Sequence, residues 1–380
     1  MSSAPDRANA LNNFRTPYAL LALLLIGSRL LLLGIAGLSL LIVRKGDFFT
    51  SPSGILDWFL RWDTGWYLGI ANEGYSYTPG AQSSVAFFPL YPAVIALLGK
   101  ILGGPVIAGY LVSNLALYGA LVFLWKWIRY EYADSKLATN GCWFLLIGPV
   151  SFFFSTLYTE STFLFFSVGC LYFGRNQKWL AAGLLGYGAS LTRNIGIFLV
   201  PALLWEYYNA WRHAEPSARR ISFSTIACCL LPGLGLATYM AYLWNAFGDP
   251  LAFSRVQHAW ARKLTFPWKV FYPWRIASME PFYCYWFLGV VASTLFAIAA
   301  GFWLRVRFAT MLIIIVPLLL YFSTNNLESI PRYISILFPL YLIAALLSRK
   351  SWLWERAMMA ASLTASAIST ILFVNGYWFT

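Results

Sequence analysis

The chain has 380 residues, of which 60% are hydrophobic and 19% aromatic, whereas charged residues make up only 11%. This composition excludes an ordinary soluble protein, because soluble domains are less apolar and carry about twice this share of charge. The net charge of +13 is spread over short clusters between apolar runs, which excludes a nucleic-acid-binding patch and fits anionic partners at a membrane surface. We expect an all-α protein that crosses a membrane several times.

Apolar runs long enough to cross about 30 Å of hydrocarbon follow one another along the chain. They lie at 18–43, 86–102, 105–125, 137–157, 158–174, 179–208, 221–246, 282–304, 308–323, 334–347 and 355–375. They predict about eleven transmembrane helices in a single domain, residues 1–380.

Two connections are long, 44–85 (the first loop) and 247–281 (the second loop), and both are rich in aromatic, Gly, Pro and charged residues. Long loops on a rigid scaffold often carry function. With the N-terminus inside, most basic short loops fall on one side and both long loops face the non-cytoplasmic side. The same count of eleven spans puts Lys126, Arg129 and Lys136 on the outer side. Splitting 179–208 into two spans would make the number of spans even and so change the side on which loops fall.

The first loop contains an amphipathic pattern with an acidic residue on its apolar stripe. The pattern predicts a helix along the membrane surface over 54–74; its stripe contains Leu56, Phe59, Leu60, Asp63, Tyr67 and Ile70. Partial desolvation of a carboxylate favours its protonated form, which suits a group that takes a proton from a hydroxyl. The alternative is that Asp63 pairs with Arg61 or caps a turn at 64–65.

Several stretches, taken together, resemble one known family. They are "RWDTGWYLGIANEGY" (61–75), "AFFPLYP" (86–92), "GPVSFFFSTLYTES" (148–161), "LTRNIG" (191–196), "FGDPLAFSRVQHAW" (247–260) and "PRYISILFPLY" (331–341). In this order they resemble the PIG-V family of mannosyltransferases, of the GT-C class of membrane glycosyltransferases. The resemblance implies a sugar donor carried on a polyprenyl phosphate and a catalytic aspartate in the first non-cytoplasmic loop, the position of Asp63.

The chain contains no Asn-x-Ser/Thr acceptor and is shorter than the eukaryotic members of that family. It therefore looks like a bacterial relative, and we expect it in the inner (plasma) membrane with its active site on the non-cytoplasmic side. The acceptor, a lipid or a glycan, stays open.

Further candidates come from charged and aromatic residues beside apolar runs. The candidates for donor phosphate or sugar binding are Arg29, Arg193, His258, Arg262, Lys263, Arg332 and Tyr333. The arginines are included because guanidinium groups suit phosphate oxygens. Candidates for the acceptor or pocket are Trp62, Trp66, Tyr67, Glu160, Gln257 and Trp260. The alternatives are that Arg29 reaches the membrane interface, that Glu160 pairs with a nearby arginine, that His258 is structural and that Trp260 belongs to an interfacial belt.

These observations favour an inverting mannosyltransferase in which Asp63 is the general base, with a polyprenyl-phosphate sugar as donor, a lipid or glycan as acceptor, and no nucleic-acid partner. No cofactor is expected. The sequence has no metal-ligand spacing, and a divalent ion held by Asp63 has no support in it. The alternative is a multi-pass transporter or lipid flippase, which would share the apolar runs and buried arginines, although no internal repeat is visible.

Overall fold

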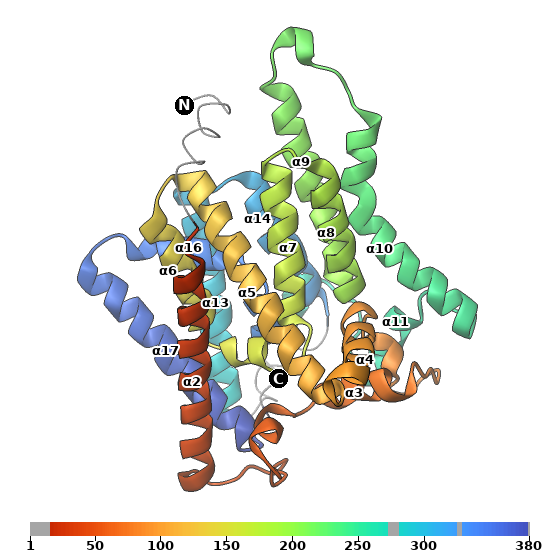
Figure 1. Cartoon of the computed structure of the whole chain (residues 1–380), viewed down its shortest axis with the longest axis vertical. Coiled ribbons are helices and arrows are strands. Elements are labelled where there is room, and N and C mark those ends of the chain that lie inside the picture. Colours follow the sequence, from red (N-terminus) through yellow and green to blue (C-terminus); the bar gives the residue numbers. More distant parts are fainter. Residues whose placement is uncertain (1–15, 273–280, 325–328, 379–380) are drawn as a thin grey trace.

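The computed structural model describes residues 16–272, 281–324 and 329–378, and these residues form an all-helical bundle (Figure 1). The α-helices are α2 (Tyr18–Ile42), α3 (Thr64–Glu73), α4 (Leu90–Leu102), α5 (Pro105–Tyr132), α6 (Ser135–Leu146), α7 (Glu160–Arg175), α8 (Trp179–Thr192), α9 (Leu199–Arg212), α10 (Phe223–Phe247), α11 (Ala252–Arg255), α13 (Pro281–Trp303), α14 (Phe308–Ser323), α15 (Ile330–Ser335), α16 (Pro339–Ser348) and α17 (Trp352–Val374). Short 3-10 helices connect them, among them η1 (Ile55–Phe59), η3 (Ser151–Ser155), η4 (Asn194–Phe198) and η6 (Val256–Trp260). The predicted all-α class is confirmed.

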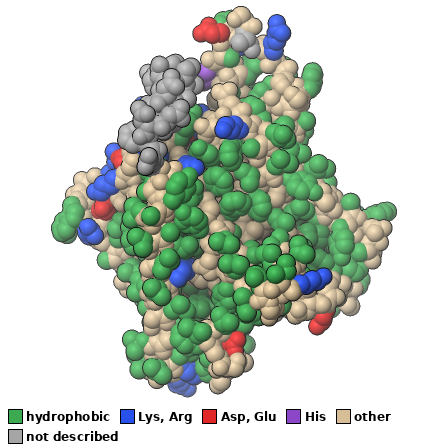
Figure 2. Space-filling model, in the orientation of Figure 1, with side chains coloured by type: hydrophobic (Ala, Val, Ile, Leu, Met, Phe, Trp, Pro, Cys, Tyr) green, Lys and Arg blue, Asp and Glu red, His purple; other side chains and the backbone are tan. Residues whose placement is uncertain are grey.

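Five helices of the described part are long and apolar enough to cross a membrane: α2, α5, α10, α13 from Tyr283, and α17. Shorter apolar helices, α4, α14 and α16, pack among them. The face seen in Figure 2 is largely hydrophobic, with charged side chains near its margins. Large apolar side chains such as Leu23 and Leu30 are exposed on α2, as expected where lipid tails replace water. The chain is an integral membrane protein.

Local sequence explains several helix ends. Asp134, Ser222 and Ser351 precede α6, α10 and α17, and each side chain accepts a hydrogen bond from the third residue of its helix, the usual N-cap arrangement. Gly103 and Gly248 follow α4 and α10 in left-handed backbone conformations, which glycine adopts without steric cost. Capping residues and glycine therefore set these boundaries.

One end of the bundle, here the basic end, gathers the short charged connections. The ends of α5, α7 and α16 lie there with the starts of α6 and α14 and part of α9, in the upper half of Figure 1, and the start of α17 lies at the left of the picture. Four ion pairs join them: Glu131 with Arg175, Asp134 with Arg349, Lys136 with Glu355, and Glu206 with Arg307.

The two long loops meet away from the basic end. In the first loop the carbonyl oxygen of Leu56 accepts a hydrogen bond from Tyr110, in the second turn of α5. Between the loops, Tyr77 donates a hydrogen bond to Asp249 at 3.3 Å, and the rings of Trp66 and Trp260 lie 5.9 Å apart. Residues 273–280 of the second loop lie outside the described residues.

Two of the predicted runs take a different form in the structure. Run 86–102 contains a helix of only 13 residues, α4, about 20 Å long. Run 179–208 is two helices, α8 and α9, joined by η4. Lys126, Arg129 and Lys136, which the predicted count places on the outer side, lie at the basic end: Lys136 pairs with Glu355 there, and Lys126 and Arg129 belong to the last two turns of α5.

The predicted single helix over 54–74 is wrong. Helix η1 ends at Phe59, and α3 starts only at Thr64. Between them Trp62 has a left-handed φ of 52°, which breaks the helical path. Tertiary contacts hold this break: Arg61 donates to Thr50 and to the carbonyl oxygen of Val374. Asp63 therefore does not continue the apolar stripe of η1.

Three irregular segments lie between helices in the middle of the bundle: 147–159, 193–198 and 336–338. Run 137–157 is accordingly a helix only up to Leu146. Irregular backbone inside a membrane protein is tolerated where protein surrounds it or where it lines a cavity. The three segments, together with the start of α3, frame the site described next.

Candidate active site

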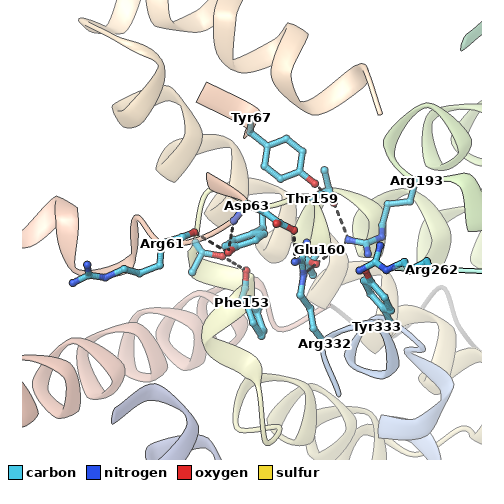
Figure 3. Close-up of polar contacts among 12 residues, drawn as sticks. Arg61, Asp63, Tyr67, Phe153, Thr159, Glu160, Arg193, Arg262, Arg332 and Tyr333 are labelled. Carbon is cyan, nitrogen blue, oxygen red and sulfur yellow. Dashed lines mark hydrogen bonds and ion pairs between the residues drawn. The ribbon is translucent and has the colours of Figure 1, made fainter. Parts of the chain in front are cut away.

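Four charged side chains form one connected network (Figure 3). Nη1 of Arg332 lies 2.5 Å from Oδ2 of Asp63, and Nε of the same guanidinium lies 2.6 Å from Oε1 of Glu160. Glu160 Oε1 also accepts a hydrogen bond from Nη1 of Arg193 at 2.8 Å. Arg332 therefore bridges two carboxylates, and Glu160 bridges two guanidinium groups.

Three of the four members of this network stand at helix ends. Asp63 directly precedes α3, Glu160 is the first residue of α7, and Arg193 directly follows α8. Arg332 lies on the short helix α15. A carboxylate at a helix N-terminus is stabilised by the helix dipole, which favours the ionised form of Glu160 in its buried place.

Exposure differs sharply between the two carboxylates. The side chain of Glu160 is fully buried, whereas that of Asp63 is 28% exposed and that of Arg332 only 3%. Oε2 of Glu160 has no hydrogen-bond partner among the described residues. The network thus presents Asp63 outward and keeps Glu160 inside, where it can hold arginines but cannot meet a substrate.

A third arginine completes what we term the arginine cluster, Arg193, Arg262 and Arg332 around the ring of Tyr333. Their guanidinium carbons lie 5.4, 5.6 and 5.9 Å from the ring centroid. Arg262 donates to the hydroxyl of Tyr333 at 2.8 Å and to Oε1 of Gln257 at 2.9 Å. These contacts bring the predicted residues Gln257 and Arg262 of the second loop to the residues around Asp63.

Charge in this site is unbalanced. Among the described residues, Arg193 and Arg332 pair with Glu160 and Asp63, whereas Arg262 bonds to two neutral side chains, Gln257 and Tyr333. Within this part of the chain, three guanidinium groups against two carboxylates leave one net positive charge. Buried or partly buried charge is costly unless it is compensated, so the site is suited to an anion.

Aromatic residues cover the side of Asp63 toward the second loop. Trp66, one helical turn after Asp63, stacks on Phe87 at 5.6 Å, and Trp260 packs edge-on against Trp66. Tyr67 is buried, and its hydroxyl lies 3.3 Å from Oγ1 of Thr159. Burial raises the pKa of Tyr67 well above its usual range, so its hydroxyl stays protonated and can donate.

Other predicted residues lie elsewhere. Arg29 on α2 bonds to Ser28 and Ser155, and within the described ranges it makes no hydrogen bond or ion pair to the arginine cluster. The side chain of Trp62 packs against Trp378, with ring centroids 4.6 Å apart, and so faces the C-terminal segment.

His258 and Lys263 are exposed, and no side-chain bond from either to the cluster is found in the described part of the chain. Among the same residues, no three His, Cys, Asp or Glu side chains are grouped as metal ligands.

Two residues of the site were not predicted. Tyr158 accepts a hydrogen bond from the backbone N–H of Asp63, and its ring lies under Arg332. Thr159 accepts a hydrogen bond from Arg193 at 2.9 Å. Both belong to the stretch "LYTES" that contains Glu160, so its polar residues next to Glu160 were the available signal.

Comparison with known proteins adds relatives of two kinds. A family model described as Mannosyltransferase (PIG-V) matches residues 50–262. A GPI mannosyltransferase 2 from Drosophila pseudoobscura pseudoobscura is 26% identical over 218 residues, 52% of this chain and 46% of that protein. The chain thus spans about half the length of this curated relative.

Two crystal structures of ArnT from Cupriavidus metallidurans have a similar fold. One is bound to undecaprenyl phosphate (TM-score 0.53) and one is in the apo state (TM-score 0.52). Each is 14% identical and covers 93% of this chain, with 77% and 76% of the ArnT chain covered. The fold is that of GT-C glycosyltransferases. Because the family model covers more than half of the chain, including Asp63, Glu160 and Arg193, the protein belongs to the PIG-V family of mannosyltransferases.

Proposed function

We propose that the protein is an inverting mannosyltransferase that moves the sugar of a polyprenyl-phosphate donor to an acceptor hydroxyl, with Asp63 as general base. One observation carries the proposal. A partly exposed carboxylate, Asp63, lies 2.5 Å from Arg332 in a cluster whose third guanidinium, Arg262, has no acidic partner in the described ranges. A base beside a phosphate site is what this reaction needs.

The donor phosphate fits the charge of the arginine cluster. A polyprenyl-phosphate sugar is a phosphodiester with one negative charge, which would bring three guanidinium groups and two carboxylates to neutrality. Arg262 and Tyr333 would bind phosphate oxygens from the side of the second loop. The polyprenyl chain would lie along apolar helix faces, and ArnT, which shares the fold, was crystallised with undecaprenyl phosphate.

The chemical step is balanced within these groups. The acceptor hydroxyl gives its proton to Asp63 while its oxygen forms a bond to the anomeric carbon. The bond from that carbon to the phosphate oxygen breaks on the opposite face, and its electron pair leaves with the phosphate. The configuration at the anomeric carbon is therefore inverted.

Charge is conserved around the arginines during this step. Asp63 loses its negative charge on taking the proton, and the leaving polyprenyl phosphate gains one. Arg332, no longer opposed by an ionised Asp63, is free to stabilise the new phosphate charge. Glu160 retains its ionised form and keeps Arg193 and Arg332 in place, so the positive charge is preorganised before the transition state.

The membrane orientation follows from the same arrangement. Basic residues accumulate on the cytoplasmic side of membrane proteins, and this chain gathers its short basic connections at the basic end. The loops that carry Asp63 and Arg262 would then face the non-cytoplasmic side of a bacterial inner membrane. The acceptor is a lipid or a glycan that reaches the site from there.

The test is transfer of labelled mannose from a polyprenyl-phosphate donor by purified protein in lipid vesicles. We expect Asp63→Asn to lower kcat by about 10²–10⁴-fold, the usual contribution of a general base. Asp57→Asn is the matched control, because Asp57 lies in the same loop but its carboxylate accepts hydrogen bonds from the backbone and side chain of Ser53, away from Arg332. If Asp63→Asn turns over like the wild type, the base assignment is wrong. Movement of donor lipid across the vesicle without any covalent product would favour a flippase instead.

A further inference from the structure

A single buried tyrosine contacts both sides of the Asp63–Arg332 pair. The hydroxyl of Tyr158 donates a hydrogen bond to the carbonyl oxygen of Arg61 at 2.8 Å and accepts one from the backbone N–H of Asp63 at 3.2 Å. The guanidinium carbon of Arg332 lies 4.4 Å from the centre of its ring. One side chain therefore touches the backbone that presents the carboxylate and the cation that faces it.

The backbone held by Tyr158 is strained. Trp62, the residue between its two hydrogen-bond partners, has a φ of 52°, a left-handed conformation that is unfavourable for a bulky side chain. Such a conformation persists only where surrounding contacts determine it. Tyr158 supplies two of these contacts, and the packing of Trp62 against Phe48 and Trp378 supplies others.

Burial makes these hydrogen bonds hard to replace. Tyr158 is fully buried, so water cannot easily take the place of its hydroxyl. Without that hydroxyl, the N–H of Asp63 and the carbonyl of Arg61 would each lose a partner. A buried polar group without a partner is costly, so the turn would move in search of new partners and carry the Asp63 carboxylate with it.

We propose that Tyr158 is a positioning residue, which holds the strained 61–63 turn so that Asp63 stands at a fixed distance from Arg332 and the acceptor. The inference rests on the proposed role of Asp63 as base. Tyr158 touches neither substrate nor reacting atoms. Its ring keeps Arg332 oriented through a cation–π contact, and its hydroxyl sets the backbone, so the two roles can be separated by removing the hydroxyl alone.

The test compares Tyr158→Phe with Tyr91→Phe. Tyr91 is equally buried, and its hydroxyl bonds to Ser113 and Gly109, away from the turn. Hydrogen exchange of the Asp63 amide reports the turn directly and needs no activity. We expect Tyr158→Phe to speed this exchange by about tenfold or more, since the amide loses its acceptor, and Tyr91→Phe to leave it unchanged.

Kinetics then test the consequence for catalysis. A displacement of about 1 Å at a reacting group can cost on the order of 100-fold, so we expect Tyr158→Phe to lower kcat by roughly 10–100-fold with little change in the donor KM. In the background of Asp63→Asn, the same change should cost little more, because its effect acts through Asp63. A merely structural role would lower both backgrounds equally.

The outcomes separate the two proposals. Unchanged exchange at the Asp63 amide in Tyr158→Phe overturns the positioning role, whatever the activity. Faster exchange with an unchanged kcat also overturns it, because the turn would then not matter for catalysis. If the wild type transfers no sugar, the proposed function fails, and the exchange measurement still decides whether Tyr158 holds the turn.

Discussion

Replacing Glu160 by Gln tests whether one buried carboxylate holds the arginines. The change keeps the shape of the side chain and removes its charge. Glu160 Oε1 accepts two charge-assisted hydrogen bonds, from Arg193 at 2.8 Å and from Arg332 at 2.6 Å, each worth about 1.5–3 kcal/mol. In Glu160→Gln the arginines stay charged, so both hydrogen bonds remain charge-assisted on the donor side and weaken rather than disappear.

The uncompensated charge adds to this loss. Breaking a buried ion pair typically costs about 3–5 kcal/mol, and in Glu160→Gln the site would hold three guanidinium groups against Asp63 alone. We expect the free energy of unfolding to fall by about 3 kcal/mol, measured by denaturation in mixed micelles. The rate of sugar transfer should fall by roughly 100-fold, because Arg332 loses the anchor that orients it.

Glu131→Gln is the matched control at the basic end. Glu131 is also mostly buried and pairs with Arg175 at 2.5 Å, but it lies far along the bundle from Asp63. We expect it to lose stability in the same range and to retain its transfer rate once folded. If Glu160→Gln has the same free energy of unfolding as the wild type, the carboxylate is not the electrostatic centre of the site. If Glu160→Gln and Glu131→Gln both lose transfer rate in proportion to their loss of stability, Glu160 has no specific role in the site.

Two further predictions concern the loops. Arg262→Gln should raise the donor KM by about tenfold or more in initial-rate assays, since one charge-assisted contact to phosphate is lost. Lys263→Gln is the control: Lys263 is next to Arg262 and exposed, so its replacement should leave the donor KM unchanged. Equal effects of the two changes would contradict a specific phosphate contact of Arg262. Gly376→Ala should lower the free energy of unfolding by about 2 kcal/mol or more, because Gly376 has a φ of 78° and an added Cβ would lie 2.4 Å from the backbone of Phe49. Gly34→Ala lies inside α2, where nothing is within 4 Å of an added Cβ, so it should cost no stability, because alanine is the better helix former. A similar loss in both variants would mean that the packing of the first loop on residue 376 is unimportant.

The sequence predicted much of the site because its residues fall in short recognisable stretches. Asp63, Glu160, Arg193 and Arg332 come from four separate stretches, and the structure brings all four into one network. Charge at the edge of an apolar run was a sound signal, since an ionisable residue in a membrane protein needs a partner. The alternative that Glu160 pairs with a nearby arginine is confirmed.

Tertiary contacts explain what the sequence could not predict. Helical spacing over 54–74 describes a continuous stripe, but Arg61 binds the carbonyl of Val374, more than 300 residues away, and the chain breaks at Trp62. Arg29 resembles the other arginines in its setting on an apolar run, yet it bonds to two serines, Ser28 and Ser155. Local periodicity contains no information about such distant partners, because packing overrides propensity.

The shared guanidinium of Arg332 has a consequence for the order of events. With the donor absent, Arg332 donates a hydrogen bond to the Asp63 carboxylate at 2.5 Å. A donor phosphate bound at Arg262 and Tyr333 would add negative charge beside Arg332 and compete with Asp63 for the same guanidinium. The carboxylate would then be released toward the acceptor hydroxyl only when the leaving group is already in place.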